Sequence, residues 1–307
     1  MALTAFSTSN AMATATVNYI DGITSVPDTW RNVVDWTEES TGALRVTSMA
    51  SIGEIASWDG AADLSSTATA AGSAGTKTIS ISQYASQVTI GRLDSETIPG
   101  LVDGMARRIG VAVANSYAKK MFGTLTDCFT SEETGDGKVF FASDHTIPGG
   151  SGTRSNVLVS ALDIAGLAAA IKAARQWVDA TGAPYDLSAG GYWLVCGPDL
   201  EEAAMQAVSS PYSLTALTGD GSQSQGLSNM VTQFLTLSDI IISPHFDDSN
   251  AWCLLPKLSA PLIGWQRLPA VMRITENPDT LGLRMTVDYA LSAACQVEPI
   301  GIGGNPS

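Results

Sequence analysis

The segment "GKVFFASDHTIPGGSG" contains the two adjacent side chains best suited to acid–base chemistry, Asp144 and His145. A histidine beside a carboxylate can act as a general base that takes a proton from a nucleophile. A hydrolase of this kind also needs a nucleophilic serine, and its usual G-x-S-x-G setting does not occur in the chain. The sequence therefore does not favour a hydrolase at this pair.

A second pattern, His245 and Asp247 in H-x-D spacing, is typical of half of a two-histidine, one-carboxylate iron site. His145 would have to supply the third ligand, but in oxygenases with this pattern the distal histidine lies downstream of H-x-D. Neither "GDGKVF" nor the C-terminal "GIGGN" has the composition and context of a phosphate-binding loop. We therefore predict no catalytic, cofactor-binding or metal-binding residues and no cofactor, and keep a metal-dependent oxygenase as the less favoured alternative.

The overall composition excludes one class of partner. The chain has 307 residues, of which 45% are hydrophobic and 15% charged, with a net charge of -14. This length suffices for a large core in one domain or two closely joined domains. With 16 basic against 30 acidic residues, dedicated nucleic-acid binding is not expected. The low charge content indicates a surface hidden against partners, although a monomer with a serine- and threonine-rich surface would have a similar composition.

The cysteines and the N-terminus bear on the compartment. Four cysteines lie far apart without a C-x-x-C pair, as expected of small buried residues in a reducing compartment. The N-terminus lacks the basic and apolar regions of a signal peptide, and no stretch approaches the ~20 apolar residues of a membrane span. The sequence predicts a soluble protein that is made and kept in a cytoplasm.

The elements that would position these side chains begin with an arm and a ribbon. Residues 1–28 are small and polar, and we expect them to be extended. Residues 43–90 predict two strands of a ribbon, with alternating apolar residues such as Ile79 and Ile81 on the return strand. The tip between them, residues 59–75, is rich in alanine, serine, glycine and threonine. Because a lone two-stranded ribbon is marginally stable, it needs another surface to lie on.

A long helix is predicted next, from about Asp94, with Pro99 in its first turn and Gly123 as a plausible end. About 25 residues would form a rod of ~37 Å. The second half is mixed, with a helix that starts in a capping box of Ser160 and Asp163 and ends before Gly182. One apolar stripe follows the long helix at helical spacing: Ile98, Leu101, Val102, Met105, Ile109, Val113, Tyr117 and Met121. Further segments predict a buried strand and helix ("GYWLVCGPDLEEAAMQAV") and several strands ("DIIISPHF", "AWCLLP", "PLIGWQRL", "GLRMTVDYALSAACQVEPIGI").

This order of elements resembles the major capsid proteins of tailed bacteriophages with the Hong Kong 97-type fold, most narrowly the Mu-like major head subunit family. The resemblance covers roughly residues 75–303. It departs from the family pattern at Ile147-Pro148, where the family has asparagine, and at Tyr289-Ala290, where it has F-G. Five segments carry it in order: "KTISISQYASQVTIGRLDSETIPGL", "GKVFFASDHTIPGGSG" with the Ser160 helix start, "GGYWLVCGPDLEEAAMQAV", "NAWCLLPKLSAPLIGWQRL" and "GLRMTVDYALSAACQVEPIG".

The resemblance implies an α+β fold divided into four parts. These are an N-terminal arm (1–41), an extended β-hairpin loop (42–91), a peripheral domain with a long spine helix (92–154 and 254–288), and an axial α/β domain (155–253 and 289–307). Asp144 and His145 match the family's linking segment between the long helix and the Ser160 helix, so we expect His145 to fix a turn by hydrogen bonding, as a joint between two domains. Relatives crosslink subunits through lysine and asparagine, but Lys77 is the only lysine between residues 1 and 118, and nothing in the sequence indicates such chemistry.

The function implied is that of a non-enzymatic major capsid protein of a phage or prophage. It would assemble with itself into pentamers and hexamers of an icosahedral shell around double-stranded DNA, without sequence-specific DNA binding and without a membrane. Scaffolding, portal and decoration proteins are the further partners expected, in a virion assembled in the host bacterial cytoplasm. The alternative within the same class is another phage structural subunit, such as a tail tube or connector protein.

Overall fold

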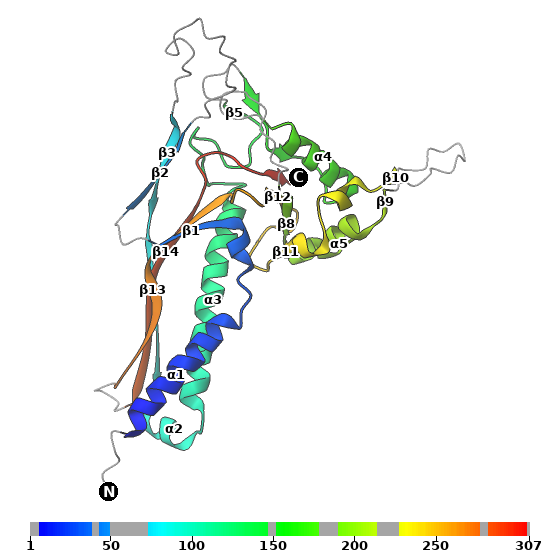
Figure 1. Ribbon diagram of the computed structural model, residues 1–307. Helices are drawn as coiled ribbons and strands as arrows, with labels where there is room; N and C mark the ends of the chain where they lie inside the picture. Colours follow the sequence, from blue (N-terminus) through cyan, green and yellow to red (C-terminus); the bar gives the residue numbers. More distant parts are fainter. Residues whose placement is uncertain are drawn as a thin grey trace, which may run out of the picture.

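The computed structural model describes residues 6–38, 43–49, 73–146, 152–177, 190–213, 227–276 and 282–305. It has an elongated limb, a lobe at one side of the limb's upper end, and a two-stranded ribbon that projects away from both (Figure 1). We call the first part the long limb (6–38, 82–127 and 262–295) and the second the side lobe (152–256 and 302–304).

The long limb is built on a four-stranded sheet in the order β1-β13-β14-β4. Strand β1 runs parallel to β13, and the other pairs are antiparallel. The hairpin of β13 and β14 loses its regular register between Gln266 and Val271, in a stretch that contains Pro269. Proline has no N–H to donate to the ladder, so an irregularity is expected there. The bounds are β1 (Val34–Glu38), β4 (Ser82–Ile90), β13 (Leu262–Glu276) and β14 (Leu283–Cys295).

Helix α3 (Leu101–Asp127) packs along this sheet and is the predicted long helix, with different ends. A short helix, α2 (Arg92–Thr97), precedes it, and the chain turns at Gly100, whose φ is 74°. The single helix predicted from Asp94 is therefore wrong, because the Pro-Gly pair breaks it. Gly123 does not end α3, since a glycine inside a helix lowers its stability by only about 1 kcal/mol.

The N-terminal segment is a helix, α1 (Phe6–Thr24), and the extended conformation predicted for it is wrong. Its side chains Ala15 and Tyr19 are buried. The helix crosses α3 where two glycines meet. A Cβ atom on Gly22 would lie 2.2 Å from the Arg107 carbonyl oxygen, and one on Gly110 would lie 2.2 Å from the Tyr19 carbonyl oxygen. Backbone packing against α3 therefore overrides the weak helix propensity of a serine- and threonine-rich sequence.

The side lobe contains a five-stranded sheet in the order β11-β8-β12-β15-β7. One face, including Leu194 and Leu254, packs on helices α4 and α5, while the other, including Val195 and Leu255, joins the core of the long limb. The predicted strands at 192–196, 240–242 and 252–256 are confirmed. The bounds are β7 (Val157–Leu158), β8 (Tyr192–Cys196), β11 (Ile240–Ile242), β12 (Trp252–Pro256), β15 (Ile302–Gly304), α4 (Ile164–Arg175) and α5 (Glu201–Ser209).

Helix α4 starts differently from the prediction. Its N-cap is Asp163, whose Oδ1 accepts a hydrogen bond of 2.6 Å from the Gly166 N–H, so a capping box with Ser160 as the N-cap is wrong. The predicted end near Gly182 lies outside the described residues, and the helix itself ends at Arg175. Aspartate is as good an N-cap as serine, so residue type alone does not distinguish the two candidates.

The ribbon consists of β2 (Ala43–Met49) and β3 (Ser73–Ser80), which pair antiparallel as predicted. Its tip lies outside the described residues. At its base Ile79 is buried against Ile263, Trp265 and Ala294. The remaining short elements are β5 (His145–Thr146) with β6 (Thr153–Arg154), β9 (Tyr212–Ser213) with β10 (Leu227–Ser228), and the 3-10 helices η1 (Thr29–Val33), η3 (Pro198–Leu200), η4 (Met230–Gln233) and η5 (Leu237–Asp239).

Candidate functional site

His145, the sequence's first candidate for chemistry, is fully buried. Its Nε2 donates to the Phe140 carbonyl oxygen over 3.0 Å, and its Nδ1 lies 2.9 Å from Oδ2 of Asp136. The same carbonyl accepts a 2.7 Å hydrogen bond from the buried Asn156 amide. The adjacent Asp144 instead forms an exposed ion pair with Lys138. The prediction that His145 fixes a turn by hydrogen bonding is confirmed, with Asp136 as its carboxylate partner.

The surroundings of Asp136 favour its ionised form. Burial alone would raise its pKa, but hydrogen bonds from Thr134, His145 and the Lys138 N–H hold the pKa of Asp136 below its usual value. The Phe140 carbonyl oxygen and the Asp136 carboxylate thus hold the two ring nitrogens of His145 from opposite sides. The network ties the described segment 134–146 to Asn156 through hydrogen bonds of Asp136, His145 and the Phe140 carbonyl oxygen.

The residues of the alternative iron site do not come together. Within the described ranges, which include His145, His245 and Asp247, no group of three histidine, cysteine, aspartate or glutamate side chains could hold a metal ion. The backbone N–H of His245 donates to the Ser243 hydroxyl, and that of Asp247 lies 3.3 Å from the Thr126 hydroxyl. These contacts form a turn after β11 and do not assemble the ligands of an oxygenase.

A second polar cluster, which we call the ribbon anchor, lies at the base of the ribbon and consists of Lys77, Glu132, Glu133 and Cys295. The ammonium of Lys77 lies 2.6 Å from Oε2 of Glu132, 2.9 Å from the Glu133 carbonyl oxygen and 3.2 Å from Sγ of Cys295. Burial opposes the charge, but the Cys295 sulfur and Glu132 raise the pKa of Lys77 overall. The ribbon is thus joined to the end of β14 and to the turn after α3 by one largely buried cation.

Sequence reasoning missed the ribbon anchor. Its members are separated by 55 residues between Lys77 and Glu132 and by 218 between Lys77 and Cys295. Nothing in such distant single residues indicates contact. The one available signal was the isolation of Lys77, the only lysine in the first 118 residues, in an otherwise apolar and hydroxyl-rich strand.

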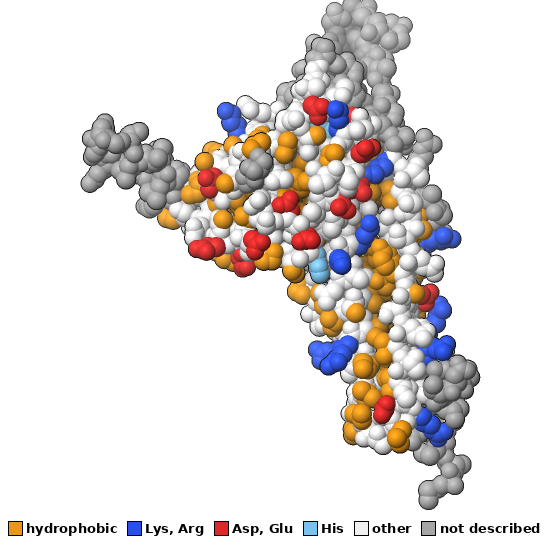
Figure 2. All heavy atoms as spheres, turned by 180° about the vertical axis from the view of Figure 1, so that it is seen from behind, with side chains coloured by type: hydrophobic (Ala, Val, Ile, Leu, Met, Phe, Trp, Pro, Cys, Tyr) orange, Lys and Arg blue, Asp and Glu red, His pale blue; other side chains and the backbone are white. Residues whose placement is uncertain are grey.

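The long limb also presents apolar surface. A pocket of about 380 Å³ opens between α3 and the strands β4 and β14, lined among others by Tyr84, Met105, Ile109 and Tyr289. In the view from behind, hydrophobic side chains form a stripe along this limb (Figure 2). The stacked rings of Tyr84 and Tyr289, whose centroids are 5.2 Å apart, form part of the wall of the pocket. Such a surface suits packing against another protein chain.

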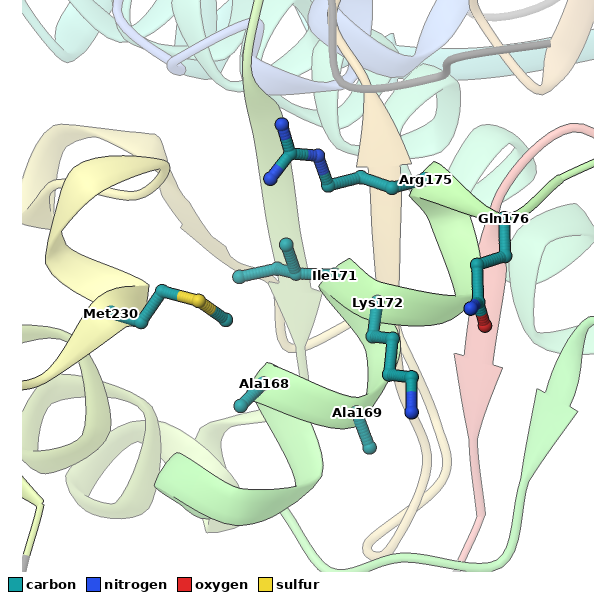
Figure 3. Close-up of a pocket in the computed structure, with 7 residues that line it drawn as sticks. All are labelled: Ala168, Ala169, Ile171, Lys172, Arg175, Gln176 and Met230. Carbon is teal, nitrogen blue, oxygen red and sulfur yellow. The ribbon is translucent and has the colours of Figure 1, made fainter. Parts of the chain in front are cut away.

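A further shallow pocket of about 600 Å³ lies on the side lobe between α4 and η4. Ala168 and Ile171 from α4 point toward Met230 of η4, while Lys172 and Gln176 point away from it (Figure 3). Met230 itself is 42% exposed. Arg175 also lines the gap, with its guanidinium over the Phe234 ring, and the other side chains that point into it are apolar, so this pocket fits protein packing better than chemistry.

Among the residues with described positions, no helix combines the length and apolar character needed to cross a bilayer.

Comparison with solved structures defines the class of the fold. The virus-like particle from Pyrococcus furiosus is similar with a TM-score of 0.57 and 11% identity, over 95% of this chain and 97% of that one. The capsid of cyanophage P-SCSP1u is similar with a TM-score of 0.57 and 11% identity, over 90% of this chain and 87% of that one. The mature capsid of bacteriophage PhiM1 is similar with a TM-score of 0.55 and 9% identity, over 91% of this chain and 87% of that one. The fold is that of Hong Kong 97-type capsid subunits.

The sequence places the protein within that class. The profile of the family described as phage capsid protein matches residues 74–303. The chain belongs to this family. A comparison with curated proteins gave no significant match. Because the family match and the fold agree, the chain is a major capsid protein, a self-assembling structural subunit of an icosahedral virion shell. The predicted fold class and function are confirmed.

Proposed function

We propose that the chain forms the pentamers and hexamers of a phage or prophage head that encloses double-stranded DNA, and that it has no enzymatic activity. The observation that carries this proposal is the ribbon, whose described strands β2 and β3 pair with each other and whose base packs on the limb sheet at Ile79. A two-stranded element of this kind gains its burial from a neighbouring subunit. The apolar pocket on the long limb supports the same proposal, since it offers a surface that a neighbour can cover.

The proposed peripheral and axial domains each contain one of the two sheets. The long limb, with α3 as the spine, would form the peripheral domain, and the side lobe would form the axial domain around the capsomer axis. The ribbon would be the extended loop that lies over an adjacent subunit. We place the limits at the ends of the sheets rather than at the predicted 254–288, because β12 pairs with β8 in the lobe and β14 continues to Cys295 in the limb.

The charge of the subunit fits the enclosed DNA. A net charge of -14 disfavours adhesion to a polyanion, so the packaged DNA would be enclosed without sequence-specific contacts. Assembly would take place in the host bacterial cytoplasm, where all four cysteines remain free thiols. Scaffolding, portal and decoration proteins would be separate chains.

The test is deletion of residues 61–75 at the tip and return strand of the ribbon, followed by negative-stain electron microscopy of the expressed protein. The expected result is a folded subunit, by circular dichroism, that fails to form closed shells. A matched control replaces residues 61–75 with glycine and serine at equal length, which separates loss of length from loss of side chains. Normal shells from the deletion would contradict the role of the ribbon, and rings or tubes from the unaltered chain would identify a connector or tail tube instead.

A further inference from the structure

The two helices that cover the lobe sheet carry opposite charges. Helix α4 lies toward the top of the lobe and α5 toward the bottom in Figure 1, and η4 contacts both. In the side lobe, acidic residues outnumber basic ones by ten to three. Two of the three basic residues, Lys172 and Arg175, lie in the last turn of α4. Two of the acidic ones, Glu201 and Glu202, lie in the first turn of α5, so the helix layer has a basic and an acidic end.

At the α4 end, the pocket of about 600 Å³ between α4 and η4 combines an apolar gap with two cations. Ile171 of α4 points toward Met230 of η4 across this gap (Figure 3). Lys172 and Arg175 also line the pocket, and both are exposed. The Arg175 guanidinium lies over the Phe234 ring, but neither cation forms an ion pair within the described part of the chain. We call this pocket and its two cations the basic pocket.

The α5 end has the opposite character. Glu201, Glu202 and Met205 are exposed and share one face of the helix, since residues three and four positions apart are neighbours there. Asp199 adds an exposed carboxylate just before the helix. Glu202 accepts a 2.9 Å hydrogen bond from Gln206, but no ion pair of either glutamate occurs among the described residues. We call Glu201, Glu202 and Met205 the acidic face.

The acidic face and the basic pocket are complementary. Two carboxylates match two cations, and a protruding methionine matches an apolar gap, which its flexible thioether side chain can fill. The helix dipole favours acidic residues at a helix start and basic residues at its end, which accounts for the charges but not for the exposed Met205 or the apolar gap. A contact between two different patches of identical chains repeats head to tail and forms a ring when the rotation closes.

We propose that the acidic face of one copy of this chain docks into the basic pocket of the next copy, and that this contact, repeated head to tail, joins the side lobes around a capsomer. The inference rests on the proposed function, which supplies the pentamers and hexamers. In the contact, Met205 of one copy fills the gap beside Met230 of the next, and the two glutamates face the two cations. Exposed ion pairs are individually weak, so their part is to select this face of the neighbour over others.

Zero-length cross-linking tests the contact directly. A carbodiimide joins an amine to a carboxylate only where the two touch, so the assembled protein should yield a peptide that links Lys172 to Glu201 or Glu202. Mixed copies labelled with nitrogen-14 and nitrogen-15 should show by mass spectrometry that the link joins different copies. On denaturing gels the linked protein should form a ladder that extends to pentamers and hexamers. The matched control, Lys172→Arg, keeps the charge and should keep the assembly, but it has no amine to cross-link.

Charge reversal tests whether the contact controls assembly. A first variant, Lys172→Glu with Arg175→Glu, makes both surfaces acidic. A second, Glu201→Lys with Glu202→Lys, makes both basic. In each, the yield of sedimenting shells at low salt should fall about tenfold or more, because like charges now meet. A variant with all four substitutions has complementary charges again and should recover the yield, although it carries every change at the helix ends, so recovery separates the contact from helix stability.

A mixture of the two reversal variants tests the ring. Each acidic copy finds complementary neighbours only among basic copies, so the two must alternate around a ring. A hexamer can alternate throughout, but a pentamer keeps at least one contact between like charges. Electron microscopy of the mixture should therefore show hexamers with few closed shells, whereas the variant with all four substitutions should form both.

Four results would overturn the inference. They are the absence of the Lys172 link from assembled protein, a ladder that stops at the dimer, shell yields unchanged by both reversals, and a folded four-substitution variant that assembles no better than either reversal. Circular dichroism confirms that each variant is folded. A failure of the unaltered chain to form closed shells is a separate result that contradicts the proposed function, because the link and the ladder still report the contact in any ring that forms.

Discussion

The side lobe and the long limb contain sheets of similar strand number but bury them differently. In the lobe, every residue of β12 is buried, because α4 and α5 cover one face of the sheet and the limb core covers the other. In the limb, β13 is fully buried only over its first four residues, and most of its second half is partly or fully exposed. The lobe sheet is thus enclosed by the subunit's own chain, whereas the far part of the limb sheet remains exposed in the single subunit.

This difference in burial separates residues that stabilise the folded subunit from residues that stabilise the assembled shell. Residues of the lobe sheet should determine whether the subunit folds, since each substitution there leaves a cavity within the chain. Exposed residues of the limb should determine whether folded subunits assemble. Four substitutions test this distinction, and they are ordered by the size of the effect expected on the subunit.

Trp252→Ala should have the largest effect. The ring is fully buried, and its Nε1 donates to the Ser160 carbonyl oxygen over 3.1 Å. Its removal should lower the free energy of unfolding by about 3–5 kcal/mol, measured by urea denaturation. Because the lobe sheet shares its other face with the limb core, we expect one cooperative transition. Two separate transitions would show that limb and lobe fold independently, and the exposed Met205→Ala serves as a control that should change little.

Gly110→Ala tests the contact between α1 and α3. The new methyl group would lie 2.2 Å from the Tyr19 carbonyl oxygen, so α1 has to move, at a cost of about 1–3 kcal/mol. Limited proteolysis of residues 6–24 reports the displacement. The matched control is Gly123→Ala in the same helix, where the methyl group meets nothing within 4 Å and should stabilise the protein by up to about 1 kcal/mol. Equal behaviour of the two variants would contradict the close contact.

Asp136→Asn tests the network of His145. The pKa of Asp136 is lower in the folded protein than its ordinary value of about 3.9, so its contribution is present above that pH and is lost as the pH falls through the folded value. The variant should lose about 1–2 kcal/mol at pH 7 and show a weaker loss of stability below about pH 4. Urea denaturation from pH 3 to pH 7 measures both. The control, Asp144→Asn, removes only the exposed ion pair, and parallel pH curves for wild type and Asp136→Asn would refute the assignment.

Val271→Ser should have the smallest effect on the subunit. The side chain is 47% exposed on the outer half of β13, so the free energy of unfolding should stay within about 0.5 kcal/mol. The yield of sedimenting shells should fall, because the apolar surface that a neighbour would cover becomes polar. An unchanged yield would show that this face of the limb is not an interface.

The sequence predicted those elements whose signal is local. Strands β8, β11 and β12 are unbroken apolar runs, and α3 has apolar residues at helical spacing over its whole length. The break before α3 was also present as the pair Pro99-Gly100, but the prediction placed Pro99 inside the first turn. Proline is tolerated in the first turn of a helix, but Pro99 lies before the helix, because Gly100 has a positive φ and α3 starts only after it.

The sequence could not predict features that arise only when distant segments meet. Helix α1 is rich in serine and threonine, and its closest contact with α3 is made by glycines, which carry no hydrophobic signal. The carboxylate partner of His145 lies nine residues before it, so the adjacent Asp144 was the obvious but wrong candidate. The ribbon anchor joins single residues from β3, the turn after α3 and β14, and no pattern in the sequence connects them.

The glycine contact between α1 and α3 has a consequence for how this protein can diverge. Because the contact is made by backbone atoms, neighbouring side chains can change freely while both glycines stay, and neither glycine can be rescued by a compensating change at the other. Two such positions do not covary, since each tolerates one residue type only. Relatives that retain this helix crossing should therefore be recognisable by an invariant pair at the positions of Gly22 and Gly110, even where the rest of the N-terminal helix has drifted beyond alignment.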